Sequence, residues 1–138
     1  MNKRNLQNIL GVYLILSHCA VIILVFVLFV PMNDFSQLTT TLGLIIPMFS
    51  VYTSTIVRFI IKNMENSNLS NQNVSKMFVF ISFLIPTIFV IYLTSIIFLK
   101  AYNYAFSNFD HFQVIIGSSE TLFGVYIGQI IVNLYENK

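Results

Sequence analysis

Four long runs of apolar residues constrain this chain more than any other feature of its sequence. A helix needs about 20 predominantly apolar residues to cross a membrane, because the hydrocarbon core is roughly 30 Å thick. At about 1.5 Å per residue, each run would form a helix of roughly 33 to 36 Å. The sequence therefore predicts four membrane spans, at residues 9–30, 38–61, 77–99 and 112–134.

Composition supports the same fold class. Hydrophobic residues make up 57% of the 138 residues and charged residues only 9%, against roughly 25% charged residues in soluble domains. Four spans and their connections occupy nearly the whole chain, so no room remains for a second domain. We therefore expect a single transmembrane domain, residues 1–138, folded as an all-α, four-helix bundle.

Basic residues predict the orientation of the bundle, because short cytoplasmic loops carry an excess of Lys and Arg. If the N-terminus lies inside, six basic residues are on the cytoplasmic side: Lys3, Arg4, Arg58, Lys62, Lys76 and Lys138. Only Lys100 then lies outside. This predicts a multi-pass protein of the bacterial inner membrane with both ends in the cytoplasm, a cytoplasmic loop at 62–76 and outer loops at 31–37 and 100–111. Because the first apolar run continues to Val30, we expect it to be a retained span rather than a cleaved signal peptide.

Ionisable side chains within a span are costly and usually face the bundle interior, so they are candidate functional residues. Measured along the helix axis, His18 and Glu120 lie about 18 Å and 15 Å into their spans and so at similar depths. One interpretation is a proton-responsive or ion-attracting pair. The other, which we favour, is a hydrogen bond that fixes the register of the two helices.

Small and polar residues form a face on two of the predicted spans. In the fourth span the helix-packing face has spacings of four, three and four, and consists of Gly117, Thr121, Gly124 and Gly128. In the second span the polar stripe recurs every three or four residues, and consists of Thr39, Gly43, Pro47, Ser50, Ser54 and Arg58. Such faces allow the close approach of another helix, either within the chain or in a second copy. We expect Arg58, near the cytoplasmic end, to extend toward lipid headgroups.

Several classes of function find no support in the sequence. No nucleophile is paired with a base and no glycine-rich phosphate loop is present, so we expect no enzyme activity. Cys19 is the single cysteine and no Cys/His group has metal-site spacing, so we expect neither metal nor cofactor. The net charge of +2 comes from residues that flank the spans rather than from a basic surface, so we expect no direct nucleic acid binding.

The size, the four-span layout and the Asn-, Ile- and Phe-rich composition, seen in the segment NMENSNLSNQNVSK, resemble the KwaA family. Members of this family are the membrane subunits of Kiwa anti-phage defence systems. The resemblance is one of architecture, and it implies an oligomeric membrane sensor that works with a cytoplasmic effector, KwaB, acting on phage DNA processes. Toxin immunity proteins are similar in size and layout.

Three functions remain open at this point. The first, which we favour, is an oligomeric inner-membrane scaffold or sensor subunit that contacts lipid and a cytoplasmic protein partner in bacterial anti-phage defence. The second is a small ion channel or transporter lined by the polar stripe and the Glu120 region. The third is a polytopic immunity protein that blocks a pore-forming toxin.

Overall fold

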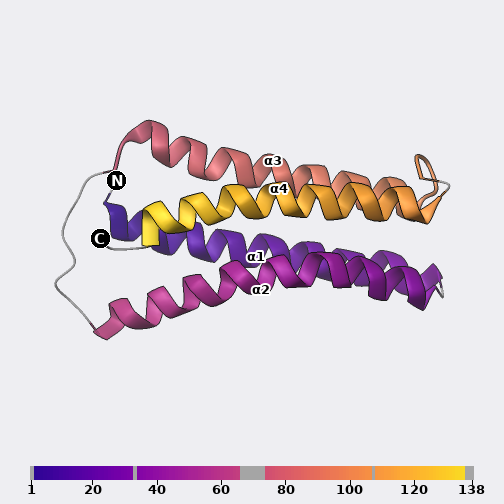
Figure 1. Cartoon of the computed structure of the whole chain (residues 1–138), viewed down its shortest axis with the longest axis horizontal. Helices are drawn as coiled ribbons and strands as arrows, with labels where there is room; N and C mark the ends of the chain where they lie inside the picture. Colours follow the sequence, from indigo (N-terminus) through magenta and orange to yellow (C-terminus); the bar gives the residue numbers. More distant parts are fainter. Residues whose placement is uncertain (1, 33, 66–73, 107, 136–138) are drawn as a thin grey trace.

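The computed structural model describes residues 2–32, 34–65, 74–106 and 108–135, without the side chains of 62–65, 131–133 and 135. Over these ranges the chain is all-helical (Figure 1). Its four long helices are α1 (Lys3–Phe29), α2 (Phe35–Glu65), α3 (Lys76–Ala101) and α4 (Phe109–Tyr135). A single turn of 3-10 helix, η1 (Val30–Met32), follows α1.

Polar residues that satisfy free backbone N–H groups mark the first turns of three helices. The Asn2 side chain accepts from the N–H of Arg4 at the start of α1. Asp34 accepts from the N–H of Gln37 at 3.0 Å at the start of α2. Asn108 accepts from the N–H of Asp110 at 2.9 Å at the start of α4. These residue types are the preferred N-caps, so short polar segments between apolar runs determine where the helices begin.

The end of α3 is also set by local chemistry. Asn103 adopts a positive φ of 54°, a conformation that asparagine tolerates better than most residues. The Tyr104 N–H then donates to the Leu99 carbonyl at 2.9 Å. The Lys100 ammonium donates to the Phe106 carbonyl at 3.0 Å and lies 5.7 Å from the centre of the Phe109 ring. The turn is thereby tied to the start of α4.

The helices pack as a four-membered ring in which α1 and α4 each contact both α2 and α3. The first and last helices also touch: the Gln7 amide of α1 donates to the Leu134 carbonyl of α4. The beginning of α1 and the end of α4 therefore lie at the same end of the bundle (Figure 1). At that end α2 and α3 diverge from each other.

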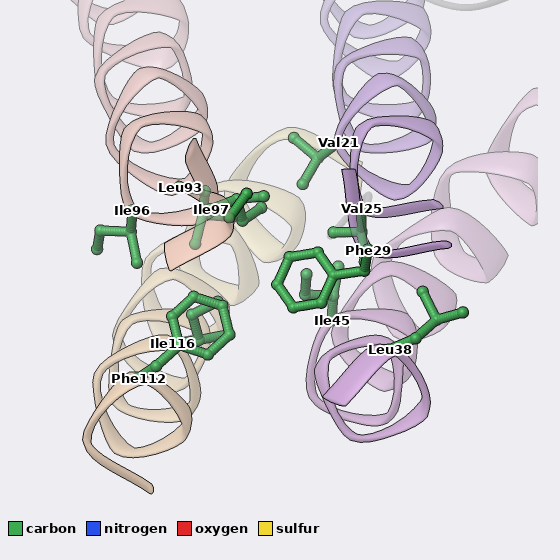
Figure 2. Packing of buried hydrophobic residues seen from close by; sticks show 11 residues of the cluster. Val21, Val25, Phe29, Leu38, Ile45, Leu93, Ile96, Ile97, Phe112 and Ile116 are labelled. Carbon is green, nitrogen blue, oxygen red and sulfur yellow. The ribbon is translucent and has the colours of Figure 1, made fainter. Parts of the chain in front are cut away.

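The bundle interior contains two apolar clusters. One lies toward the beginning of α1 and includes Leu6, Leu10 and Ile127. The other lies toward the opposite end and joins residues of all four helices, including Phe29 and Phe112, whose rings are 6.1 Å apart (Figure 2). Along α1, only the stretch between Leu14 and Val21 separates the two clusters.

Most of the apolar surface faces outward rather than into this interior. In the most apolar windows of the first three helices, only 17 to 28% of residues are buried inside the bundle. Large apolar side chains such as Leu16 and Leu122 are 63% and 74% exposed. Among the described residues, three helices are long and apolar enough to cross a membrane: Lys3–Met32 with its 3-10 turn, Phe35–Ile61 and Lys76–Ala101. An outer surface of this kind suits lipid as the solvent.

The helices extend beyond the apolar runs that predicted them. Helix α1 begins six residues before the run at 9–30, and α2 covers residues 35–65 where the run covers 38–61. Capping residues and polar end turns extend a helix without adding apolar length. Of the predicted cytoplasmic loop 62–76, residues 66–73 lie outside the described residues.

Candidate functional site

His18 lies at the centre of the bundle, fully buried, in the gap between the two apolar clusters. Its ring is surrounded by aromatic rings of the other three helices, at centroid distances of 5.0 to 6.2 Å: Phe49, Tyr52, Phe89 and Phe123. Three of these rings are roughly parallel to the imidazole, while that of Tyr52 meets it edge-on at 70°. We call this arrangement the aromatic cage.

A contact with the backbone of α1 indicates which nitrogen of the His18 ring carries a proton. His18 Nδ1 lies 3.3 Å from the Leu14 carbonyl oxygen one turn earlier in α1. A carbonyl oxygen can only accept, so Nδ1 carries the proton and Nε2 of a neutral ring has a lone pair but no proton to donate. Among the described residues, Nε2 has no hydrogen-bond partner.

Glu120 of α4 is the acidic side chain inside the bundle, and it is only 2% exposed. Neither of its carboxyl oxygens has a hydrogen-bond partner within the described part of the chain. His18 and Glu120 are therefore both buried but do not hydrogen-bond to each other. The register-fixing hydrogen bond favoured from the sequence is not present in this structure.

Tyr52 of α2 is a member of this polar centre that the sequence interpretation did not single out. It is 2% exposed, and its hydroxyl has no hydrogen-bond partner among the residues described. Its position in the middle of an apolar span could have identified Tyr52 from the sequence, because a buried phenol usually requires a polar partner.

A pocket opens beside Glu120 between α2 and α4. Its volume is about 260 Å³, and it is lined from α2 by Gly43, Leu44, Pro47, Met48 and Val51, and from α4 by Gly117, Glu120 and Thr121. Two members of the polar stripe, Gly43 and Pro47, thus lie opposite two members of the packing face, Gly117 and Thr121. The small residues on the two helices leave the space that this pocket occupies.

The glycines of the packing face differ in their surroundings. A Cβ placed on Gly124 would lie 1.9 Å from the terminal methyl of Met48, and one on Gly117 would lie 3.6 Å from Leu44. One on Gly128 would meet no atom within 4 Å. The first two glycines therefore pack against α2 within the chain, whereas Gly128 and Thr121 lie on the exposed surface.

The polar stripe lies on the outside of the bundle. All six members are exposed: Thr39, Gly43, Pro47, Ser50, Ser54 and Arg58. The hydroxyls of Thr39, Ser50 and Ser54 donate to carbonyls of their own helix. Their hydrogen bonds are thereby satisfied without a neighbouring helix, but the stripe remains a small and polar surface among lipid-facing residues.

A second, mainly apolar groove of about 410 Å³ lies between α3 and α4. Its lining includes Phe89 and Phe123, which stack at 3.8 Å and also belong to the aromatic cage. At its polar edge Ser119 donates to the Tyr92 hydroxyl at 3.2 Å. The cage is thus flanked by an apolar groove on one side of α4 and by the Glu120 pocket on the other.

Three side chains of this polar centre, His18, Tyr52 and Glu120, have polar atoms with no hydrogen-bond partner among the described residues. In the described ranges no three His, Cys, Asp or Glu residues are grouped as a metal-ion site, and no base accompanies a nucleophile at Glu120. The arrangement offers one buried donor, the Tyr52 hydroxyl, and buried acceptors, the Glu120 carboxyl oxygens and His18 Nε2. Comparison of the chain with protein-family models, with curated proteins and with solved structures gave no match.

Proposed function

We propose that this chain is an oligomeric scaffold or sensor subunit of the bacterial inner membrane that acts with a cytoplasmic partner protein in anti-phage defence. It crosses the membrane four times, α4 providing the fourth span, with both ends in the cytoplasm. It has no enzyme activity of its own. A pathway for ions is the runner-up function.

The exposed polar stripe of α2 is the observation that carries the assembly proposal. Small residues at a membrane surface allow two helices to approach closely, and close packing drives helix association where lipid is the alternative neighbour. On α4, the exposed Thr121 lines the pocket beside Gly43 and Pro47 and so extends this small surface. A second copy of the chain that covers the stripe would bury it against protein.

Two features support the proposed topology. The contact between Gln7 and Leu134 brings the first and last helices together at one end of the bundle. Lys3 and Arg4 stand at the beginning of α1 and Arg58 in the last third of α2, and both of these helix ends lie at that same end of the bundle (Figure 1), as expected for a cytoplasmic face. The role in defence and the cytoplasmic partner rest on the architectural resemblance to the KwaA family.

The assembly proposal is tested by placing a bulky side chain on the stripe. Ser50→Phe fills the proposed interface, and Ser95→Phe on α3 is the matched control. Both serines are exposed, and each donates to the carbonyl four residues earlier, Ser50 at 2.9 Å and Ser95 at 2.7 Å. Native mass spectrometry from nanodiscs should show a smaller assembly for Ser50→Phe and the wild-type size for Ser95→Phe. An unchanged assembly in Ser50→Phe would refute the stripe as an interface.

The defence role is tested separately by challenging cells with phage. Phage should plate at least about tenfold less efficiently on cells that express the chain with its neighbouring genes than on cells lacking only the chain. Affinity-tagged chain should also co-purify with the soluble product of a neighbouring gene. Equal plating on both strains would contradict the defence role while leaving the assembly result unaffected.

One observation favours the ion pathway as a second candidate. Glu120 lines a pocket near the middle of its span, and buried acids of this kind often mark ion routes. Conductance of purified protein in liposomes that is lost in Glu120→Gln would support a pathway. Liposomes that stay ion-tight with functional wild-type protein would rule it out.

A further inference from the structure

The turn between α3 and α4 carries a row of exposed aromatic rings. Tyr102 and Tyr104 are 60% and 81% exposed, and Phe98, in the last turn of α3, is exposed as well. The rings of Phe98 and Tyr102 are nearly parallel with centroids 6.2 Å apart, and Tyr104 lies at the same distance from Tyr102. We call these three residues the aromatic row. Phe35, which begins α2 at the same end of the bundle, is a further exposed ring (Figure 1).

Backbone hydrogen bonds hold the aromatic row on the end of α3. The Tyr102 N–H donates to the Phe98 carbonyl at 3.1 Å, and the Asn103 N–H donates to the Lys100 carbonyl at 3.0 Å. The Tyr104 N–H is bonded to a carbonyl of α3 in the same way. Both tyrosines are therefore presented at a defined level, directly beyond the last turn of the helix.

The lysine next to the row is turned away from its surface. Lys100 is buried, because its ammonium donates to the Phe106 carbonyl and lies beside the Phe109 ring. The exposed surface of the row thus combines apolar rings with uncharged polar groups, namely two phenol hydroxyls and the neighbouring Asn103 amide. Tyrosine, which is apolar along its ring and polar at its tip, is enriched where the hydrocarbon core meets the headgroups.

The length of α3 places the row at that level of the bilayer. Its 26 residues extend over about 39 Å at 1.5 Å per residue. The hydrocarbon core is roughly 30 Å thick, and the bilayer with its headgroups is roughly 40 to 45 Å thick. A centred α3 therefore passes the core by about 4 to 5 Å at each end. Lys76 then lies among the headgroups of one leaflet and the aromatic row among those of the other.

The composition of the row favours lipid over another membrane helix as its neighbour. Helices associate in membranes through small residues that let their backbones approach closely. All three members of the row are large, whereas small residues are concentrated on the polar stripe of α2. The row and the stripe are thus suited to different neighbours, phospholipid for the row and protein for the stripe.

We propose that the aromatic row is a docking surface for phospholipid headgroups. Its rings lie at the level of the glycerol esters, and the phenol hydroxyls of Tyr102 and Tyr104 hydrogen-bond to ester and phosphate oxygens. The row thereby determines how deeply this end of the bundle sits in the bilayer. This inference rests on the proposed crossing of the membrane, but it depends neither on which end faces the cytoplasm nor on assembly.

Fluorescence quenching in liposomes tests the depth of the row. The chain contains no tryptophan, so a single introduced tryptophan reports only its own position. Tyr104→Trp places it in the row, and Leu122→Trp is the matched control, because Leu122 is equally unprotected but lies in the middle of α4. Each full-length variant is reconstituted in phosphatidylcholine that carries bromine on its acyl chains, either near the headgroup or near the methyl end. Bromine quenches a tryptophan at its own depth most strongly.

We expect Tyr104→Trp to lose more fluorescence with the shallow bromines and Leu122→Trp to lose more with the deep ones. Stronger quenching of Tyr104→Trp by the deep bromines would overturn the proposal. So would a Tyr104→Trp signal that neither lipid quenches, in two distinguishable ways: aqueous acrylamide quenches it if the row lies in water and leaves it bright if protein covers the row. A Leu122→Trp signal that neither lipid quenches would instead refute the membrane crossing on which the proposal rests.

Discussion

Removing the Tyr52 hydroxyl should leave the bundle as stable as wild type or make it slightly more stable. The phenol is 2% exposed and its oxygen lacks a hydrogen-bond partner among the described residues. A buried polar group left unpaired costs about 1 to 3 kcal/mol. Tyr52→Phe keeps the ring, with its contacts to His18 at 5.0 Å and to Phe49 at 5.7 Å. We therefore expect the free energy of unfolding of Tyr52→Phe to lie between the wild-type value and about 1 kcal/mol above it. The gain is smaller than the full cost of an unpaired group because the surrounding residues relax around the hydroxyl.

The matched variant Tyr52→Ala separates the hydroxyl from the ring. It removes an aromatic side chain from the middle of the bundle, a change that typically costs about 3 to 5 kcal/mol. Reversible unfolding in mixed detergent micelles would measure both variants against wild type. A loss of more than about 1 kcal/mol in Tyr52→Phe would refute the reasoning, because it would mean that the hydroxyl has a hydrogen-bond partner such as Glu120.

Gly124→Leu should destabilise the folded monomer by about 1 to 3 kcal/mol, because the larger side chain crowds Met48. Gly128→Leu should leave the unfolding temperature unchanged. Equal unfolding temperatures in the two variants would contradict the packing of Gly124 against Met48. His18→Ala should lower the free energy of unfolding by about 3 kcal/mol through the loss of ring contacts, and His18→Phe should lower it by less than about 1 kcal/mol. A phage-defence defect in a stably folded His18→Phe variant would instead assign the imidazole a chemical role. Lys100→Met should lower stability by about 1 to 2 kcal/mol, because it removes a charged hydrogen bond and a cation–π contact; an unchanged unfolding temperature would argue against both contacts.

The helices could be predicted from the sequence because apolar runs of membrane length have few alternatives in lipid. Backbone polar groups must be satisfied internally there, and a helix does this locally. The structure is all-helical over the described ranges, and three of its helices are long and apolar enough to cross a membrane. Helix formation can therefore be predicted from each apolar run by itself, whichever helices later become its neighbours.

The surroundings of Glu120 and His18 could not be predicted in the same way. The sequence interpretation placed both inside the bundle at similar depth, but depth alone does not fix rotation about the helix axis. In the structure His18 lies in the aromatic cage, whereas Glu120 borders the pocket beside Pro47 with both carboxyl oxygens buried. The cage depends on rings from three other helices, so it follows from tertiary packing that no single span encodes.

The same limit applies to the polar stripe of α2. Its spacing of three or four residues predicts one helical face, but it could not show whether that face points inward or outward. The interior is occupied instead by the neighbouring face, including Ile45, Tyr52 and Ile56. An exposed stripe shifts the expected partner from another helix of the chain to a second copy.

Membrane topology is the central claim of this account, and cysteine labelling tests it most directly. In a variant with Cys19 replaced by alanine, single cysteines at Asn5 and Asn103, both exposed, report on opposite ends of the bundle. A membrane-impermeant maleimide added to spheroplasts should label the Asn103→Cys protein and should label the Asn5→Cys protein only after lysis. A third cysteine at the C-terminal Lys138 should behave like the one at position 5. Labelling of positions 5 and 138 on opposite sides of the membrane would contradict four spans with both ends in the cytoplasm.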